Sequence, residues 1–279
     1  MKRKSLKKLL IILFSVVFVL VALLTTLTVG VSIADSSWEH IYADEAKQDI
    51  SSILQKANLT DEEYQILYRQ TGLTKIGIDD LRKKGKIQQL LILQNAFLKQ
   101  QTVHCRNFAP FTYTEEILGY MPLTSLKNGD ILVSSSMHVS FLRYGHAALV
   151  VDAQKGDVLE IAEMGSLSGF DEAIDFCDRA NFMVLRPNLP QELIDQVVEN
   201  AKTNLTDIPY DATVGVLSPK FATKPTGTQC AHLVWYAYKQ FGIDLDSDGG
   251  AVVRPKDIAN SPYLQVVQVF GFDLEELWK

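Results

Sequence analysis

The chain has 279 residues, of which 47% are hydrophobic and 22% are charged. This composition excludes an intrinsically disordered protein, because disordered chains hold too few apolar residues to form a core. The chain has 27 basic and 33 acidic residues, and five of the basic ones lie within the first eight positions. The rest therefore has 27 − 5 = 22 basic residues against 33 acidic ones, a formal charge of −11. That charge argues against nucleic acid as a partner held by bulk electrostatics.

The first 34 residues are typical of a membrane-targeting segment. A basic stretch from Lys2 to Lys8 precedes an uncharged, mostly apolar run from Leu9 to Ala34. A run of this length can span a bilayer, so we expect residues 9–34 to anchor the chain. The small residues around Ala34 also fit a signal-peptidase site, and cleavage there would release a secreted protein. In both cases the basic end stays in the cytoplasm and the remainder lies outside it.

Residues 35–120 are predicted to form a helical extension and a linker. Residues 60–63, Thr-Asp-Glu-Glu, match a capping box, and residues 87–98 form an amphipathic run. A linker over residues 108–122, marked by Pro110 and Pro122, then leads into residues 121–279.

The third segment, residues 121–279, carries strand signals first and helix signals later. Strands are expected at 130–133, 146–152, 158–163 and 183–185, then helices over 190–204 and from about 228, and a closing strand at 264–272. This order predicts an α+β domain with an antiparallel sheet and not a doubly wound fold.

Cys230 lies in the first turn of the later helix, for which Thr228 is the expected N-cap and Gly242 the expected stop. Free amides and the dipole at a helix N-terminus stabilise a thiolate, so this position suits a nucleophile. The alternative is a buried structural thiol. Of the other two cysteines, Cys105 and Cys177 either pair or stay as separate thiols, because three cysteines do not form a disulfide framework.

A thiolate enzyme needs an imidazole base, and a third group that orients the imidazole. The chain has five histidines: His40, His104, His138, His146 and His232. His232 is two positions from Cys230 on one helix and projects roughly 200° away from it. His40 and His104 have no strand or helix end to position them, which leaves His138 and His146. We favour His146, because it begins a strand directly after Gly145.

The third group is expected on the strand over residues 158–163. An odd number of residues in the connecting loop places Glu160 opposite His146, and an even number selects Glu163. Gly156 lies in that loop and suits an odd loop with a bulge, so we favour Glu160. The alternative role for Glu160 is a solvent-facing strand residue.

Taken together, these motifs resemble the permuted NlpC/P60 proteins, the circularly permuted papain-like group called YiiX/YycO-like. The resemblance rests on residues 129–132, 144–151, 158–160, 229–235 and 253–258, and it covers about residues 120 to 272. It implies a papain-like fold in which the base strand precedes the nucleophile helix. The sequence departs from the family at Ala231, where many members have a serine.

The resemblance implies a cysteine hydrolase with Cys230 as nucleophile, His146 as base and Glu160 as the third residue, while Tyr210 borders the site. The implied reaction cleaves an amide or ester bond of a cell-wall peptide or a lipid-linked substrate through a thioester. It needs no metal or other cofactor, and Cys230 with His232 does not match a zinc motif. The alternative is a non-catalytic envelope-binding module, which need not keep sulfur, imidazole and carboxylate in line.

Overall fold

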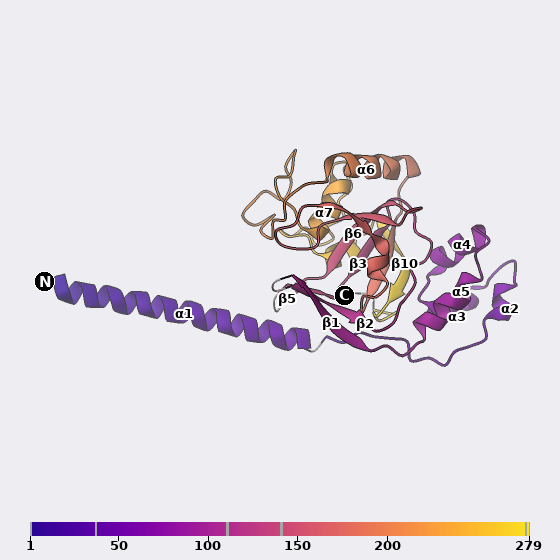
Figure 1. Ribbon diagram of the computed structural model, residues 1–279, viewed down its shortest axis with the longest axis horizontal. Helices are drawn as coiled ribbons and strands as arrows, with labels where there is room; N and C mark the ends of the chain where they lie inside the picture. Colours follow the sequence, from indigo (N-terminus) through magenta and orange to yellow (C-terminus); the bar gives the residue numbers. More distant parts are fainter. Residues whose placement is uncertain (1, 37, 110–111, 140–141, 277, 279) are drawn as a thin grey trace.

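The computed structural model describes residues 2–36, 38–109, 112–139, 142–276 and 278. Figure 1 shows a long N-terminal helix that extends away from a body of sheets and shorter helices. The elements in chain order are α1 (Lys2–Ser36), α2 (Ser51–Leu54), α3 (Asp61–Thr71), α4 (Lys75–Lys83), α5 (Gln89–Phe97), β1 (Val103–Ala109), β2 (Thr112–Ile117), β3 (Ile131–Ser134), β4 (Met137–Val139), β5 (Leu142–Arg143), β6 (His146–Asp152), β7 (Asp157–Glu160), β8 (Gly169–Glu172), the 3-10 helix η1 (Ala173–Phe176), β9 (Phe182–Pro187), α6 (Gln191–Asn204), α7 (Cys230–Lys239), α8 (Pro255–Ala259) and β10 (Leu264–Phe270).

The central element is a six-stranded antiparallel sheet in the order β10-β9-β3-β6-β7-β8. The predicted α+β class with an antiparallel sheet is therefore confirmed. Strand β6 begins at His146, as the sequence predicts, and His146 pairs with Ser134 at the end of β3. The candidate base thus lies at one end of a central strand.

The two faces of this sheet carry two hydrophobic cores. Odd-numbered residues of β6, such as Leu149, pack with α6 and α7, whereas even-numbered ones, such as Val150, pack with α3, α4 and α5. Because successive side chains of a strand point to opposite faces, a strand covered on both sides is apolar throughout. Figure 1 shows α6 and α7 on one side of the sheet and α2 to α5 on another.

The helical extension docks against the edge strand β10. Thr60 caps α3 in a complete capping box with Glu63, as the sequence predicts, and α3 ends at Gly72 in the left-handed conformation. The Gly72 carbonyl accepts a hydrogen bond from the Val269 amide at 2.8 Å, and the Thr74 amide donates to the Val267 carbonyl at 3.0 Å. The turn between α3 and α4 therefore covers backbone groups that an edge strand would otherwise expose.

The segment predicted as a linker contains regular structure instead. Strands β1 and β2 pair with each other, and β2 pairs with β4, giving a second antiparallel sheet in the order β1-β2-β4-β5. Pro110 lies outside the described residues. The sequence missed these strands because their polar residues give no regular alternation.

Helix α7 differs from its prediction at both ends. Gln229, and not Thr228, is its N-cap, so Cys230 is the first helical residue. The helix ends at Lys239 with Gln240 as C-cap, and Gly242 lies in the following turn at φ 82°. The shift brings the Cys230 amide to the very start of the helix.

Helix α1 covers the predicted membrane segment and includes Ala34. Several side chains at both ends of α1 lie outside the described residues, and among the residues described no helix meets the length and hydropathy of a membrane span. The span expected over residues 9–34 stays a prediction.

We expect Gly72→Ala to lower the free energy of unfolding by at least about 2 kcal/mol more than Gly85→Ala does. Both glycines have positive φ, 71° and 67°, so each alanine incurs a conformational cost of about 1 kcal/mol. A Cβ at Gly72 would lie 2.2 Å from the Val269 carbonyl oxygen, whereas a Cβ at Gly85 meets nothing within 4 Å. Urea denaturation of both variants measures the difference, and equal costs would contradict the described docking.

Candidate active site

The Cys230 thiol lies at the N-terminus of α7 and is 3% exposed. The Gln229 side chain caps this terminus: its Oε1 accepts from the Ala231 amide at 3.0 Å and lies 3.5 Å from Sγ of Cys230. Its Nε2 donates to the Val253 carbonyl at 2.6 Å, which fixes the amide orientation. Glutamine is not among the preferred N-caps, so the sequence did not single it out.

His146 and Glu160 form a short polar contact within the site. Nε2 of the fully buried His146 ring lies 2.6 Å from Oε2 of Glu160, on the adjacent strand β7. The Nε2–H group therefore donates to the carboxylate, which leaves Nδ1 as the other proton-carrying position. Nδ1 has no hydrogen-bond partner of proper geometry among the described residues. The Cys230 thiol is nevertheless close enough to raise the pKa of the ring.

The electrostatics of the pair favour an imidazolium beside a carboxylate. Burial lowers the pKa of His146, but the Glu160 charge, the neighbouring Cys230 thiol and the hydrogen bond to Glu160 outweigh burial and raise that pKa from 6.5 to about 9. Burial raises the pKa of Glu160, yet the His146 charge and hydrogen bond, with a smaller effect of Arg179, leave it below its ordinary value. The ring thus holds a proton at neutral pH.

The β6–β7 register explains why Glu160, and not Glu163, meets His146. Asp152 pairs with Asp157, so residues 153–156 form an even, four-residue loop in place of the expected odd one. A bulge between Val150 and Asp152 then shifts the register by one residue. Glu160 thereby shares the face of His146 as its diagonal neighbour, and not as the residue directly opposite it.

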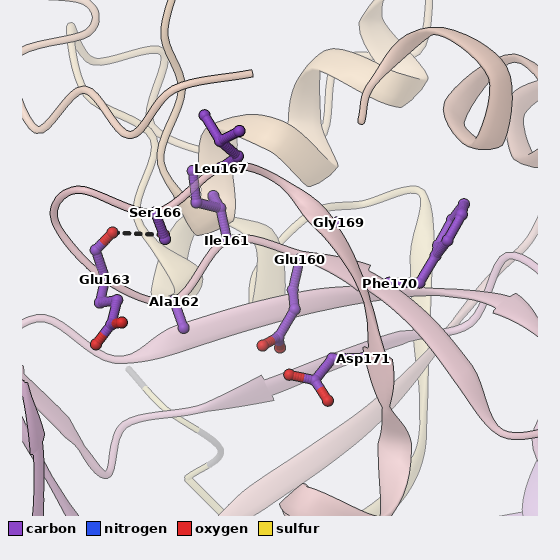
Figure 2. A pocket seen from close by; sticks show the side chains of 9 residues that line it. All are labelled: Glu160, Ile161, Ala162, Glu163, Ser166, Leu167, Gly169, Phe170 and Asp171. Carbon is purple, nitrogen blue, oxygen red and sulfur yellow. Dashed lines mark hydrogen bonds between the residues drawn. The ribbon is translucent and has the colours of Figure 1, made fainter. Parts of the chain in front are cut away.

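Glu163 lies beyond the end of β7, in a loop beside a cavity of about 330 Å³. Figure 2 shows its carboxylate turned away from Glu160, whose own carboxylate points towards Asp171. The Glu163 carbonyl accepts a hydrogen bond from the Ser166 hydroxyl at 2.6 Å. Glu163 therefore helps to shape the loop and does not contact the His146 ring.

Two tyrosines border the thiol. Tyr210 bridges to Thr228, and its amide donates to the Ser166 carbonyl at 3.1 Å, which holds it beside the start of α7. Burial, followed by a negative charge at Cys230, raises the pKa of both Tyr210 and Tyr144. Tyr210 was predicted at this border. Tyr144 was not, and the sequence signal that could have identified it is its place beside Gly145 and His146 in the motif over residues 144–151.

The other candidate histidines serve elsewhere. His232 is buried between the Thr228 hydroxyl at 2.8 Å and the Lys220 carbonyl at 2.7 Å, so it ties down the loop before α7, as its helical position predicts. His40 and His138 both approach Glu115, at 2.7 and 3.4 Å. This second cluster joins the segment after α1 to the smaller sheet and does not include the thiol.

The remaining two cysteines lie elsewhere. Cys105 is exposed on β1 and Cys177 is buried after η1, and no disulfide joins them. Burial raises the pKa of the Cys177 thiol, which disfavours its thiolate. Cys230 is therefore the cysteine with both a helix N-terminus and an imidazole beside it.

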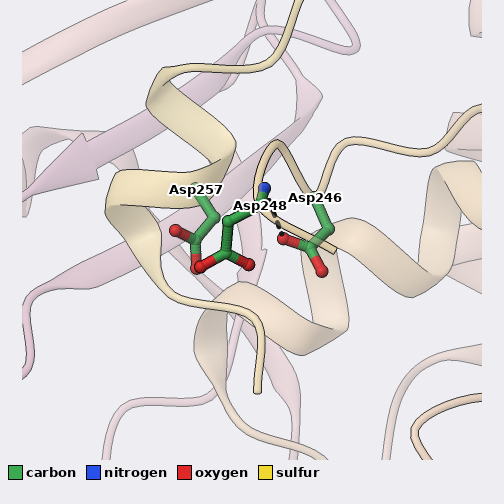
Figure 3. Close-up of side chains that lie close together, drawn as sticks. All are labelled: Asp246, Asp248 and Asp257. Atoms are coloured by element: carbon green, nitrogen blue, oxygen red, sulfur yellow. Dashed lines mark hydrogen bonds between the residues drawn. The ribbon is translucent and has the colours of Figure 1, made fainter. Parts of the chain in front are cut away.

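Three carboxylates near the site are close enough to one another to hold a cation. One oxygen from each of Asp246, Asp248 and Asp257 lies within 4.8 Å of the others (Figure 3). Asp246 pairs with Lys220, and Arg254 contacts Asp248 at 2.6 Å and Asp257 at 2.8 Å. Because all three carboxylates already contact a basic side chain, we assign the cluster a structural role.

Comparison with known proteins adds no relative: no protein-family model matches the sequence, and no match was found among the curated proteins or the solved structures.

The raised pKa of His146 predicts a pH-dependent contribution to stability. A folded-state value of about 9 against 6.5 means that the contribution is complete below about pH 6.5 and is lost as the pH rises through about 9. We expect the free energy of unfolding of the wild type, relative to His146→Gln, to fall by up to about 3 kcal/mol across this range. Urea denaturation at several pH values measures the difference.

His104→Gln provides the control, because the His104 side chain is 44% exposed on β1. We expect its stability difference from the wild type to change less over this pH range than that of His146→Gln, because charges on exposed side chains interact weakly. Equal changes for the two variants would contradict the described ion pair.

Proposed function

We propose that the chain is a cysteine hydrolase that cleaves an amide or ester bond, built on a circularly permuted papain-like scaffold. One observation carries the proposal: the buried His146 ring, held by Glu160 at 2.6 Å, lies beside a thiol at a helix N-terminus. A nucleophile, a base and an orienting carboxylate in this order form the arrangement that thiolate catalysis requires. The strand order of the antiparallel sheet, with the base strand preceding the nucleophile helix, is consistent with the permuted scaffold.

In the proposed reaction the Cys230 thiol has already given its proton to Nδ1 of His146, so the pair starts as a thiolate and an imidazolium. The thiolate attacks the substrate carbonyl carbon, and the amide at the start of α7 stabilises the oxyanion. The imidazolium then gives its proton to the leaving amine or alcohol as the carbonyl–leaving-group bond breaks, which leaves a thioester on Cys230. His146 next accepts a proton from water, whose oxygen attacks the thioester and releases the acid and the Cys230 thiolate, which restores the starting imidazolium–thiolate pair.

The substrate classes that we propose are cell-wall peptides and lipid-linked amides or esters, and the location is outside the cytoplasm. These proposals derive from the family resemblance and from the basic-then-apolar residues 2–34. The net negative charge of residues 35–279 suits substrates that are not long polyanions.

A binding module without catalysis is the second candidate. It is favoured by the low exposure of the pair, because Cys230 is 3% exposed and His146 is fully buried. A ligand that only binds would contact Tyr144 and Tyr210 and would not need the thiol. The two candidates differ in whether His146 activates Cys230.

We expect His146→Ala to slow the alkylation of Cys230 at neutral pH by at least about tenfold, because the cationic partner of the thiolate is lost. The measurement is the iodoacetamide rate of the full-length protein, with Cys105 and Cys177 changed to serine so that one thiol reports. His104→Ala is the matched control and should react like the parent. Equal rates in the His146→Ala variant and its parent would favour the binding module.

The two glutamates of the β7 region offer a second matched pair. We expect Glu160→Gln to lower the same alkylation rate about tenfold, because the neutral amide no longer stabilises the imidazolium. Glu163→Gln should leave the rate unchanged, because the ring is hydrogen-bonded to Glu160 and the Glu163 carboxylate turns away from Glu160. Equal effects of the two substitutions would exclude a specific role for Glu160.

A further inference from the structure

We propose that Arg179, which follows η1, is a positioning residue that acts on the His146–Glu160 pair through Phe176 and through its charge. This inference rests on the proposed function, since it concerns how the base of that reaction is tuned. Arg179 lies far from Cys230 in the sequence and outside the motifs that indicate the site.

Arg179 is fixed by backbone contacts on two sides. Its amide donates to the Phe176 carbonyl at 3.3 Å, and it forms an isolated antiparallel bridge with Glu116 of β2. The residue is only 8% exposed. The backbone of Arg179 is therefore fixed between η1 and the smaller sheet, and its side chain lies inside the protein.

Phe176 joins Arg179 to the His146 ring. The guanidinium carbon of Arg179 lies 4.3 Å from the Phe176 ring centroid, a cation–π distance. The same phenyl ring stacks on the His146 imidazole, with centroids 5.8 Å apart and planes inclined by 28°. One buried aromatic ring thus contacts both cationic side chains, so a change at Arg179 is transmitted to the packing of the base.

The charge of Arg179 also acts on Glu160. Both residues line a cavity of about 150 Å³ with Asp171, Asp175 and Glu116. Within the described part of the chain, Nε and Nη1 of Arg179 have no hydrogen-bond partner. A buried cation is costly unless opposite charges surround it, so these carboxylates compensate Arg179 through space.

Glu160 is the carboxylate of this cavity that also belongs to the site. Glu116 already pairs with Arg106 at 2.6 Å, and burial, with the neighbouring Asp171, raises the pKa of Asp175. Glu160 therefore lies between two cations, with a hydrogen bond to His146 and a longer-range attraction to Arg179.

The consequence concerns how tightly His146 holds its proton. The charged or titratable groups that act on the ring are Glu160 from β7, Cys230 from α7 and Arg179. Glu160 and Cys230 favour the imidazolium, whereas Arg179 opposes it. An imidazolium that holds its proton too tightly transfers it slowly to a leaving group. Arg179 offsets part of the effect of Glu160 and so allows His146 both to give up and to regain its proton in each turnover.

The test is the titration of the His146 ring, followed by NMR of the imidazole in the full-length protein. We expect Arg179→Met to move the midpoint up by about one pH unit, because a buried positive charge is removed. Arg179→Lys keeps the charge and should move the midpoint much less. Arg106→Met is the matched control at the same cavity and should leave it unchanged, because Arg106 does not act on the ring.

A merely structural role of Arg179 predicts a loss of stability with the midpoint unmoved, and that result would overturn the inference. Arg179→Gln, a polar replacement, gives the same comparison if the methionine variant does not fold. This outcome can be separated from a failure of the proposed function. If the midpoint does not move but the alkylation rate of Cys230 still depends on His146, only the role of Arg179 is rejected. If the alkylation rate does not depend on His146, the hydrolase proposal itself is rejected.

Discussion

The hydrogen bond between His146 and Glu160 is the contact on which the proposed chemistry depends. A fully buried imidazole would ordinarily lose its proton, because burial disfavours the charged form. Here a carboxylate 2.6 Å from Nε2 reverses that preference and raises the pKa of His146 to about 9. The ring therefore enters the proposed reaction as an imidazolium, the form that pairs with a thiolate and that can protonate a leaving group.

The architecture provides this contact by joining three separate elements at one end of the sheet. Strand β6 begins at His146, the bulged β6–β7 hairpin presents Glu160 on the same face, and α7 begins at Cys230. Cores on both sides of the sheet hold these elements in place, with α6 and α7 on one face and the helical extension on the other. The extension thus contributes to the rigidity of the site without a side chain of its own in it.

The sequence predicted those parts of the site that depend on local rules. The start of β6, the helix at Cys230 and the capping box at Thr60 follow from periodicity and capping preferences. The expected odd loop was wrong: the loop has four residues, and a bulge restores the face of Glu160. Arg179 and strand β2 escaped notice because their roles arise from tertiary contacts between distant segments, which no local pattern encodes.

The ultraviolet absorbance of the Cys230 thiolate as a function of pH tests the central claim most directly. The full-length protein would carry Cys105→Ser and Cys177→Ser, and the same protein with Cys230→Ser would give the blank. The account predicts that thiolate absorbance appears at a lower pH in this protein than in the same protein with His146→Ala, because the imidazolium stabilises the thiolate. Absorbance that appears over the same pH range in both proteins would contradict a thiolate–imidazolium pair.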